Sequence, residues 1–357
     1  MKFKKIFSKT KNLHRVIFAL LAVILFGSAF FVVDEIKEVD STPQSHVTKE
    51  EKQDTAPPSL LKIGFTNDWE YGPRKRLKHK LTGQAPVELL KVVNFFNNEY
   101  YPDIVIGGGD YIESSAIKKV AAKAQLADID SVFKKVTAPR LYVLGNHDMR
   151  SLTKEEVREI LEIPENHAVK DIGDWRVVVL DTNFNKEDDS DRAEKNYVAG
   201  YVSKAELTWL AGVLDTDRPV IVFSHHSPIS VPRANNLTWV INIINENDVR
   251  AVLEEKGNVV AVISGHNPQS YYEERNGIHY VVVDTLVHED ALGSFATIDL
   301  EYLKSEKFAD IIVEQHGAEF NQYSFDWYYG EKEKDLLPEI EPTSIQESEN
   351  IMLLEEE

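Results

Sequence analysis

The sequence predicts an α/β fold in which parallel strands are joined by helices, and two patterns in its folded part support this. Short apolar runs typical of strands alternate with longer segments whose apolar residues recur every three or four positions. Several of the short runs end abruptly in a glycine or a polar side chain, as strands do where a sheet meets its loops. Strands separated by helical segments favour a parallel sheet with helical crossovers.

The first half of the folded part alternates strand and helix. Residues 60–65 are predicted to form a strand, and residues 86–99 a helix that begins at a proline, which suits a first helical turn. A second buried strand at 103–106 precedes a long helix at about 114–136, which leads to a third strand that begins at Arg140. These three strands are therefore expected to be parallel.

The second half adds two helices and three buried strands. Segments 153–156 and 203–206 have the pattern of a capping box, so each is expected to start a helix. The apolar runs at 175–181, 220–223 and 259–263 are predicted strands, because they are short, rich in β-branched residues and bounded by polar segments.

Two hairpins are expected to complete the sheet structure. Asn276-Gly277 between apolar-rich flanks marks one hairpin. Alternating runs at 295–300 and 308–313 predict another, which would close the sheet. We place the folded domain at residues 60–317 and expect residues 318–357, whose end is acidic, to form a mobile tail.

Composition limits the function classes that remain. The 357 residues allow one large domain with appendages. A formal net charge of −19 argues against a general nucleic-acid binder, because such proteins present a basic face to phosphate. The absence of cysteine excludes disulfides, thiolate metal sites and thiol nucleophiles. Any metal must therefore be bound through oxygen and nitrogen.

The N-terminus is predicted to be a targeting segment. Six Lys and Arg residues lie within positions 2–15 and precede an uncharged apolar run at 16–33, which is long enough to span a membrane as one helix. Acidic residues follow, so residues 1–33 predict a signal-anchor with a cytoplasmic N-terminus and an extracytoplasmic domain. Cleavage near Gly27-Ser28-Ala29 is the alternative. Residues 34–59 are polar and contain three prolines, which predicts a flexible linker.

Side chains that can bind a metal ion follow five of the predicted strands. They are Asp68 with Glu70, Asp110, Asn146 with His147 and Asp148, His225 with His226, and His266. A single residue of this kind has an ordinary explanation as a turn, cap or core residue, but their coincidence at five strand ends favours a metal site. Oxygen and nitrogen ligands without sulfur indicate Mn, Fe, Zn, Mg or Ca.

The order of these motifs resembles the calcineurin-like metallophosphoesterases over about residues 61–300. The most specific element is Gly145-Asn146-His147-Asp148, which stands between a Gly-Asp and a Gly-His. The resemblance implies a β-sandwich of two mixed sheets flanked by helices, with one or two divalent metal ions at the strand ends. It also implies hydrolysis of a phosphomonoester or phosphodiester by a metal-activated hydroxide.

The resemblance also assigns roles to individual residues. Asp110 matches the carboxylate that bridges two metals, and the other ligands of the second metal match Asn146, His225 and His266. His226 could exchange roles with His225, and we favour His225 because the first histidine of such a pair usually lies at the strand end. His147 matches the residue that protonates or stabilises the leaving oxygen, and Asp148 would orient it through a hydrogen bond.

The sequence departs from the family pattern at the first metal. Glu70 and Pro268 stand where the common pattern has two histidines, and proline cannot ligate through its side chain. Three outcomes are open. Glu70 binds the metal with Asp68 in a carboxylate-rich site, or Glu113 or His288 fills the gap. Otherwise the first site is weak or empty, which leaves a one-metal enzyme or a catalytically silent binding protein.

A basic stretch follows the first motif. Arg74, Lys75 and Arg76 begin a run that ends at Lys80, and in so acidic a chain it would focus anionic substrates towards the metals. A solvated surface insertion is the alternative. The expected substrate is a small phosphoester, a nucleotide or a phosphorylated envelope component, and the expected membrane contact is the N-terminal helix. Net charge disfavours a nuclease, although the basic stretch does not exclude one.

Overall fold

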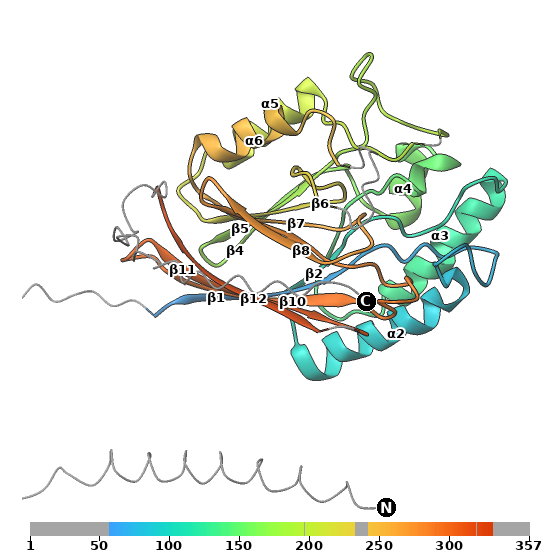
Figure 1. The fold of residues 1–357 in the computed structure, drawn as a ribbon, viewed down its shortest axis with the longest axis horizontal. Coiled ribbons are helices and arrows are strands. Elements are labelled where there is room, and N and C mark those ends of the chain that lie inside the picture. The colour runs from blue at the N-terminus through green and yellow to red at the C-terminus, as the bar shows by residue number, and fades with distance from the viewer. Residues whose placement is uncertain (1–56, 196, 233–241, 319, 331–357) are drawn as a thin grey trace, which may run out of the picture. The chain divides into compact units, whose positions relative to one another are not determined.

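Two mixed sheets packed face to face form the centre of the computed structural model, which describes residues 57–195, 197–232, 242–318 and 320–330 (Figure 1). The first sheet, in the order β12-β11-β10-β1-β2-β3, contains β1 (Ser59–Thr66), β2 (Ile104–Gly107), β3 (Arg140–Tyr142), β10 (Phe295–Leu303), β11 (Phe308–His316) and β12 (Asn321–Tyr328). The second, in the order β4-β5-β6-β7-β9-β8, contains β4 (Ala168–Ile172), β5 (Trp175–Leu180), β6 (Val220–Ser224), β7 (Val259–Ser264), β8 (Tyr271–Arg275) and β9 (Ile278–Val282). This arrangement confirms the predicted sandwich.

Strand direction follows the prediction for the parallel core of each sheet. The strands β1, β2 and β3 are parallel, and so are β5, β6, β7 and β9. Antiparallel strands complete the edges, with β10, β11 and β12 on one sheet and β4 and β8 on the other. The carboxyl ends of five parallel strands, β1, β2, β3, β6 and β7, carry the predicted metal-binding residues.

Alternating side chains divide the interior into layers. Ile63 and Phe65 of the first sheet and Val177 and Val179 of the second belong to the cluster packed between the sheets. Their neighbours point to the outer faces, where Val178 packs in a separate cluster beneath helices. The period of two in each strand therefore gives both faces of both sheets an apolar layer.

Helices cover the two outer faces (Figure 1). They are α2 (Ala85–Phe95, followed by a π-helical turn at Phe96–Tyr100), α3 (Lys119–Phe133), α4 (Lys154–Leu161), α5 (Lys204–Leu214) and α6 (Glu246–Glu255). The capping box of α4 is confirmed. At α5 only half of it forms, because Ser203 caps the helix while the Glu206 carboxylate accepts from the Asp181 amide at 3.1 Å.

Helix α3 begins five residues later than the predicted start at 114. The hydroxyl of Ser114 donates to the His147 carbonyl at 2.6 Å, and the Ser151 hydroxyl donates to the Ser114 carbonyl at 2.6 Å. These contacts bind the segment to the loop after β3, so it cannot supply the first turn of the helix.

The C-terminal boundary at residue 317 was placed too early. The Asn276-Gly277 hairpin is confirmed by the antiparallel pairing of β8 with β9. The predicted hairpin of β10 and β11 is also present, but β12 extends that sheet within residues assigned to the tail. Phe325 and Trp327 of β12 are buried in the core between the sheets. The folded domain therefore continues to at least Tyr328.

The predicted signal-anchor at 1–33, the linker up to residue 56 and the tail from residue 331 lie outside the described residues. Within the described part of the chain, no helix combines the length and apolar character that crossing a membrane requires.

Candidate metal centre

The predicted site residues meet at one edge of the sandwich. In each of three groups, one ligand atom per residue lies within 4.8 Å of the others: Asp68 with Asp110 and His225, Glu70 with Asp110 and His147, and His225 with His226 and His266. Asp110 belongs to two groups, as expected for a bridging carboxylate. The sequence therefore identified residues that the fold brings together from five strand ends.

Backbone strain accompanies this convergence. Asp68, Glu70, Asp110 and His266 have positive φ angles between 42° and 66°, a region that residues other than glycine seldom adopt. Such conformations persist where surrounding contacts enforce them, and they concentrate at functional sites. Gly145 allows the close approach of two of these loops, because a Cβ atom there would overlap the backbone nitrogen and carboxylate of Asp110.

The predicted second metal site has its ligand atoms oriented by the fold. His225 places Nδ1 2.9 Å from the Gly108 carbonyl oxygen, which only accepts, so its Nε2 is the atom presented to a metal. Asn146 donates through Nδ2 to the Tyr197 carbonyl at 2.9 Å, which turns its Oδ1 to within 3.2 Å of His225 Nε2.

Two more ligand atoms lie around the same nitrogen. Asp110 Oδ2 is 3.3 Å from His225 Nε2, and His266 Nδ1 is 3.1 Å from it. The four donors are two imidazole nitrogens, an amide oxygen and a carboxylate oxygen, a set that suits Mn, Fe or Zn. These four residues therefore fit a divalent metal ion, as metal-activated hydrolysis of a phosphoester requires.

Burial and mutual charge control protonation here. Burial alone would raise the pKa of Asp110, but the charges of His225 and His147 hold it well below its ordinary value. Burial opposes charge on His225, yet Asp110 raises the pKa of His225 to about 9. Burial and the charge of a neighbouring imidazole hold the pKa values of His226 and His266 well below the ordinary histidine value. These two rings are therefore neutral, as metal ligation requires.

His226 shares one group of converging ligand atoms with His225 and His266. Its Nδ1 is 2.7 Å from the Thr182 hydroxyl oxygen, and its ring is 4.5 Å from that of His266. Its Nε2 is buried and has no hydrogen-bond partner among the described residues. His225, in contrast, contacts both Asp110 and Asn146, which agrees with the preference for the first histidine of the pair.

The His147 ring is oriented by Glu113. Its Nδ1 lies 2.7 Å from Glu113 Oε2 and 2.8 Å from Arg150 Nη1. Because arginine cannot accept a hydrogen bond, a proton on Nδ1 belongs with Glu113, and Arg150 then donates to Glu113 and to the Ser115 hydroxyl. Burial would raise the pKa of Glu113, but its hydrogen bond with His147 holds it well below the ordinary value, so the carboxylate stays charged.

Asp148 has a different role from the predicted one. Its carboxylate accepts backbone N–H groups of Asp110 at 3.0 Å, Tyr111 at 2.8 Å and Gly145 at 3.0 Å. It therefore joins the loops after β2 and β3 instead of orienting the His147 ring, because its position at the start of a short 3₁₀ turn aims it at these amides.

The predicted first metal site is organised around a lysine. Glu70 is buried, its Oε1 accepts a hydrogen bond from the Lys80 ammonium, and its Oε2 has no partner among the described residues. Asp68 Oδ2 accepts from the His266 backbone at 2.9 Å, and burial raises the pKa of Asp68 to about 6. Neither proposed substitute ligand belongs to the groups of converging ligand atoms: Glu113 binds His147, and the ring of His288 lies beside that of His79.

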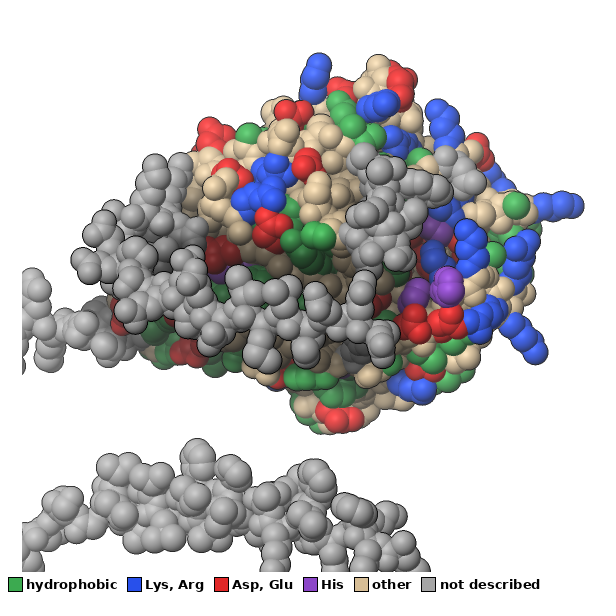
Figure 2. Space-filling model, in the orientation of Figure 1, with side chains coloured by type: hydrophobic (Ala, Val, Ile, Leu, Met, Phe, Trp, Pro, Cys, Tyr) green, Lys and Arg blue, Asp and Glu red, His purple; other side chains and the backbone are tan. Residues whose placement is uncertain are grey.

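The basic stretch lies beside this centre, but its residues differ in what they contact. Arg76 forms an ion pair with Glu289 and is half exposed. Arg74 and Glu113, the partner of His147, line a cavity of about 370 Å³, and both Arg74 and Lys75 are exposed. Figure 2 shows Lys and Arg side chains gathered with histidine over the end of the molecule that carries α3 and the loop after β1. Such a surface attracts anions.

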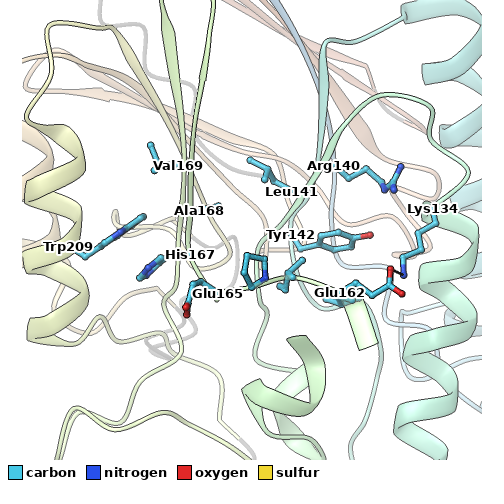
Figure 3. Close-up of a pocket in the computed structure, with 13 residues that line it drawn as sticks. Lys134, Arg140, Leu141, Tyr142, Glu162, Glu165, His167, Ala168, Val169 and Trp209 are labelled. Carbon is cyan, nitrogen blue, oxygen red and sulfur yellow. Dashed lines mark hydrogen bonds and ion pairs between the residues drawn. The ribbon is translucent and has the colours of Figure 1, made fainter. Parts of the chain in front are cut away.

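Another cavity, of about 560 Å³, lies between the start of β3 and the segment that leads from α4 into β4 (Figure 3). Several of its polar side chains have partners: the His167 ring stacks on Trp209 at 3.8 Å and binds Glu206 at 2.8 Å, and Lys134 binds Glu162 at 2.9 Å. None of the predicted site residues lines this cavity, so we place the chemistry at the strand ends.

Sequence reasoning missed two residues of the centre. Lys80 was noted only as the end of a basic run, and Glu113 only as a possible metal ligand. No spacing rule links Lys80 to Glu70 or Glu113 to His147, because each pair meets through loop conformation.

Comparisons with known proteins agree with the geometry. The family model for calcineurin-like phosphoesterases matches residues 61–270. A 3',5'-cyclic-nucleotide phosphodiesterase from Nostoc sp. is 24% identical over 141 residues, which are 38% of this chain and 47% of that protein. A manganese-dependent ADP-ribose/CDP-alcohol diphosphatase from Arabidopsis thaliana is 25% identical over 235 residues, 54% of this chain and 73% of that protein. The match to the Nostoc protein thus spans about half of its length.

Among solved structures, a dimetal phosphatase from Danio rerio matches with a TM-score of 0.61 at 16% identity. The match covers 76% of this chain and 99% of that protein. At this level of identity the similarity establishes a shared fold.

Proposed function

This chain belongs to the calcineurin-like phosphoesterase family, and from that premise we propose that it is a membrane-anchored, extracytoplasmic enzyme that hydrolyses a phosphomonoester or phosphodiester. The observation that carries the proposal is the convergence of Asp110, Asn146 and His225 on one point beside His147. The first metal site is altered, with Glu70 and Pro268 in place of two histidines.

A divalent cation bound by Asp110, Asn146, His225 and His266 would supply charge for the phosphate oxygens and activate a water for in-line attack. The protein supplies the orientation of these donors. The Gly108 and Tyr197 carbonyls hold two of them in place before any ion binds, which reduces the reorganisation that binding requires.

His147 is the proton donor to the leaving oxygen. Its Nδ1 is engaged by Glu113, and its Nε2 faces the centre, 3.8 Å from Asp110 Oδ2. Because Glu113 engages Nδ1, Nε2 is the nitrogen from which a proton can pass to the leaving oxygen as the ester bond breaks. Glu113 is thus a positioning residue, acting through His147.

The cavity lined by Arg74 and Glu113 offers space for the part of the substrate beyond the phosphate. The relatives are a 3',5'-cyclic-nucleotide phosphodiesterase and an ADP-ribose/CDP-alcohol diphosphatase, so substrates that join phosphate to a nucleoside are first to test. A small phosphoester or a phosphorylated envelope component is also compatible with an extracytoplasmic domain.

Hydrolysis of bis-p-nitrophenyl phosphate, p-nitrophenyl phosphate, cyclic AMP and ADP-ribose, each with Mn, Mg, Zn or Ca, tests the proposal. We expect turnover with at least one metal, and a large loss in Asn146→Ala and His147→Ala. A folded wild-type protein without turnover under any of these conditions would overturn the proposed activity.

The anchor is a separate part of the proposal. It is supported by the basic segment before the apolar run at 16–33. We expect the chain to stay with membranes during alkaline carbonate extraction, and its domain to be accessible to protease added outside the cytoplasmic membrane. Release into the soluble fraction would indicate a cleaved signal instead.

A catalytically silent binding protein is the second candidate, favoured by the Lys80 contact with Glu70 and by Pro268. In that case the protein would bind manganese and a phosphate ester without hydrolysing it. Isothermal titration with bis-p-nitrophenyl phosphate, combined with product analysis, separates binding from turnover.

A further inference from the structure

We propose that the Lys80 ammonium takes the place of the first cation of this fold, so that the centre holds one divalent ion, on the Asn146 side. The inference rests on the proposed function, because it concerns how the negative charge of the carboxylates in the same site is balanced. With Lys80 in place, the first site is short of ligand atoms: Pro268 offers none, and Oε1 of Glu70 is bound to the Lys80 ammonium.

The charge balance supports this assignment. Asp68, Glu70 and Asp110 are all buried, and buried carboxylates require a nearby cation. The Lys80 ammonium contacts Glu70 and so supplies a cation beside these buried carboxylates, which is the electrostatic role of a metal at this position.

The two side chains of the Lys80–Glu70 contact differ in their exposure to solvent. The Glu70 side chain is 1% exposed and the Lys80 side chain 30% exposed. The lysine stem thus reaches in from the rim and brings its charge to a carboxylate that has no access to water. Removing the ammonium would leave Glu70 as an uncompensated buried charge that can bind a metal.

The loop that carries Lys80 is held in place. The backbone groups of Leu77 and Lys80 bind each other at 2.9 Å and 3.0 Å, which closes a tight turn. Glu289, in the segment after β9, binds Arg76 on one side of this turn and His79 on the other. Lys80 is therefore aimed at Glu70 by a clamped loop, which separates it from the freely exposed lysines of the same stretch.

An ammonium can substitute for part of what a metal does. It presents three N–H donors as a compact charge, which suits a phosphate oxygen. It cannot, however, bind several ligands in a defined geometry, so activation of water would depend on the single divalent ion.

Manganese stoichiometry tests the inference. The full-length protein in detergent is stripped with a chelator, dialysed against manganese and analysed by mass spectrometry of the metal content. We expect one manganese per chain in the wild type and two in Lys80→Met, with an exchange-coupled electron paramagnetic resonance signal only in the variant. Lys78→Met, an exposed lysine of the same turn, should remain at one.

A second variant keeps the test decisive if Lys80→Met does not fold. In Glu70→Gln we expect the count to stay at one, because Glu70 binds Lys80 and not manganese. Two manganese ions in the wild type, no gain in folded Lys80→Met, or a lower count in Glu70→Gln would each overturn the inference.

The outcomes separate this inference from the proposed activity. One manganese per chain, rising to two in Lys80→Met but without turnover on any substrate, would support the role of Lys80 and overturn the enzyme. Turnover with two manganese ions in the wild type would support the enzyme activity and overturn the role of Lys80.

Discussion

The two halves of the metal centre hold their ligands in different ways. On the Asn146 side, backbone carbonyls fix two of the ligands. Asn146 Nδ2 lies 2.9 Å from the Tyr197 carbonyl oxygen, and His225 Nδ1 lies 2.9 Å from that of Gly108. On the Glu70 side, the carboxylate is held by the long side chain of Lys80, and Glu70 Oε2 has no partner among the described residues. Backbone contacts are part of the fold, whereas the lysine contact depends on one side chain.

This difference shows which half of the site depends more on single side chains. A side-chain substitution does not remove the backbone carbonyls of Gly108 and Tyr197. The contact of Glu70 with Lys80, in contrast, is lost with one substitution on a neighbouring loop. The half built on the main chain is therefore expected to dominate metal binding and activity.

The largest expected effect is on the Asn146 side. His225→Ala removes the nitrogen around which Asp110, Asn146 and His266 converge, so we expect loss of both manganese and turnover. Glu70→Ala should lower turnover but retain manganese. Metal analysis and hydrolysis of bis-p-nitrophenyl phosphate measure both quantities, and equal losses in the two variants would remove the distinction between the halves.

His147→Asn is expected to have the next largest effect. Loss of a positioned general acid typically costs about 10²–10⁴ in rate, and the loss should be large for an alkyl ester, whose leaving group needs a proton. For p-nitrophenyl esters, which leave without protonation, the loss should be smaller. Steady-state kinetics on the two substrate classes measures this, and equal losses would assign His147 to binding instead of proton transfer.

A smaller effect is expected for Glu113→Gln. Removal of a residue that orients a catalytic imidazole should lower kcat by about 10–100-fold, by analogy with partners of metal-ligating histidines. The manganese content should not change, because Glu113 contacts His147 and Arg150 and belongs to none of the groups of converging ligand atoms. A loss of manganese would instead identify Glu113 as a metal ligand.

The smallest effect is expected at the clamp around Lys80. Glu289→Ala removes an ion pair with Arg76 and a hydrogen bond with His79, both of which are partly exposed. Because surface ion pairs contribute about 0–1 kcal/mol each, the free energy of unfolding should fall by about 1 kcal/mol or less in urea denaturation. Limited proteolysis should cut the loop at 74–80 faster, and unchanged cleavage would argue against the clamp.

Much of the fold could be read from the sequence because it depends on local patterns. The short apolar runs predicted β1, β2, β3, β5, β6 and β7, and the alternation of strand and helix in the first half predicted the parallel pairing of β1, β2 and β3. The strand β12 was not predicted, although residues 321–328 alternate apolar and polar side chains. The acidic residues that follow it are typical of a mobile tail, and the predicted tail included this strand.

The sequence by itself determined which residues lie at the strand ends, because β periodicity and the order of the motifs are local properties of the chain. It therefore placed Asp68, Asp110, Asn146, His225 and His266 at one edge. The tertiary structure alone decided the partners of those residues: Glu113 for His147, Lys80 for Glu70 and backbone amides for Asp148. Such pairs join loops that only the packed sheets bring together, so no local spacing encodes them.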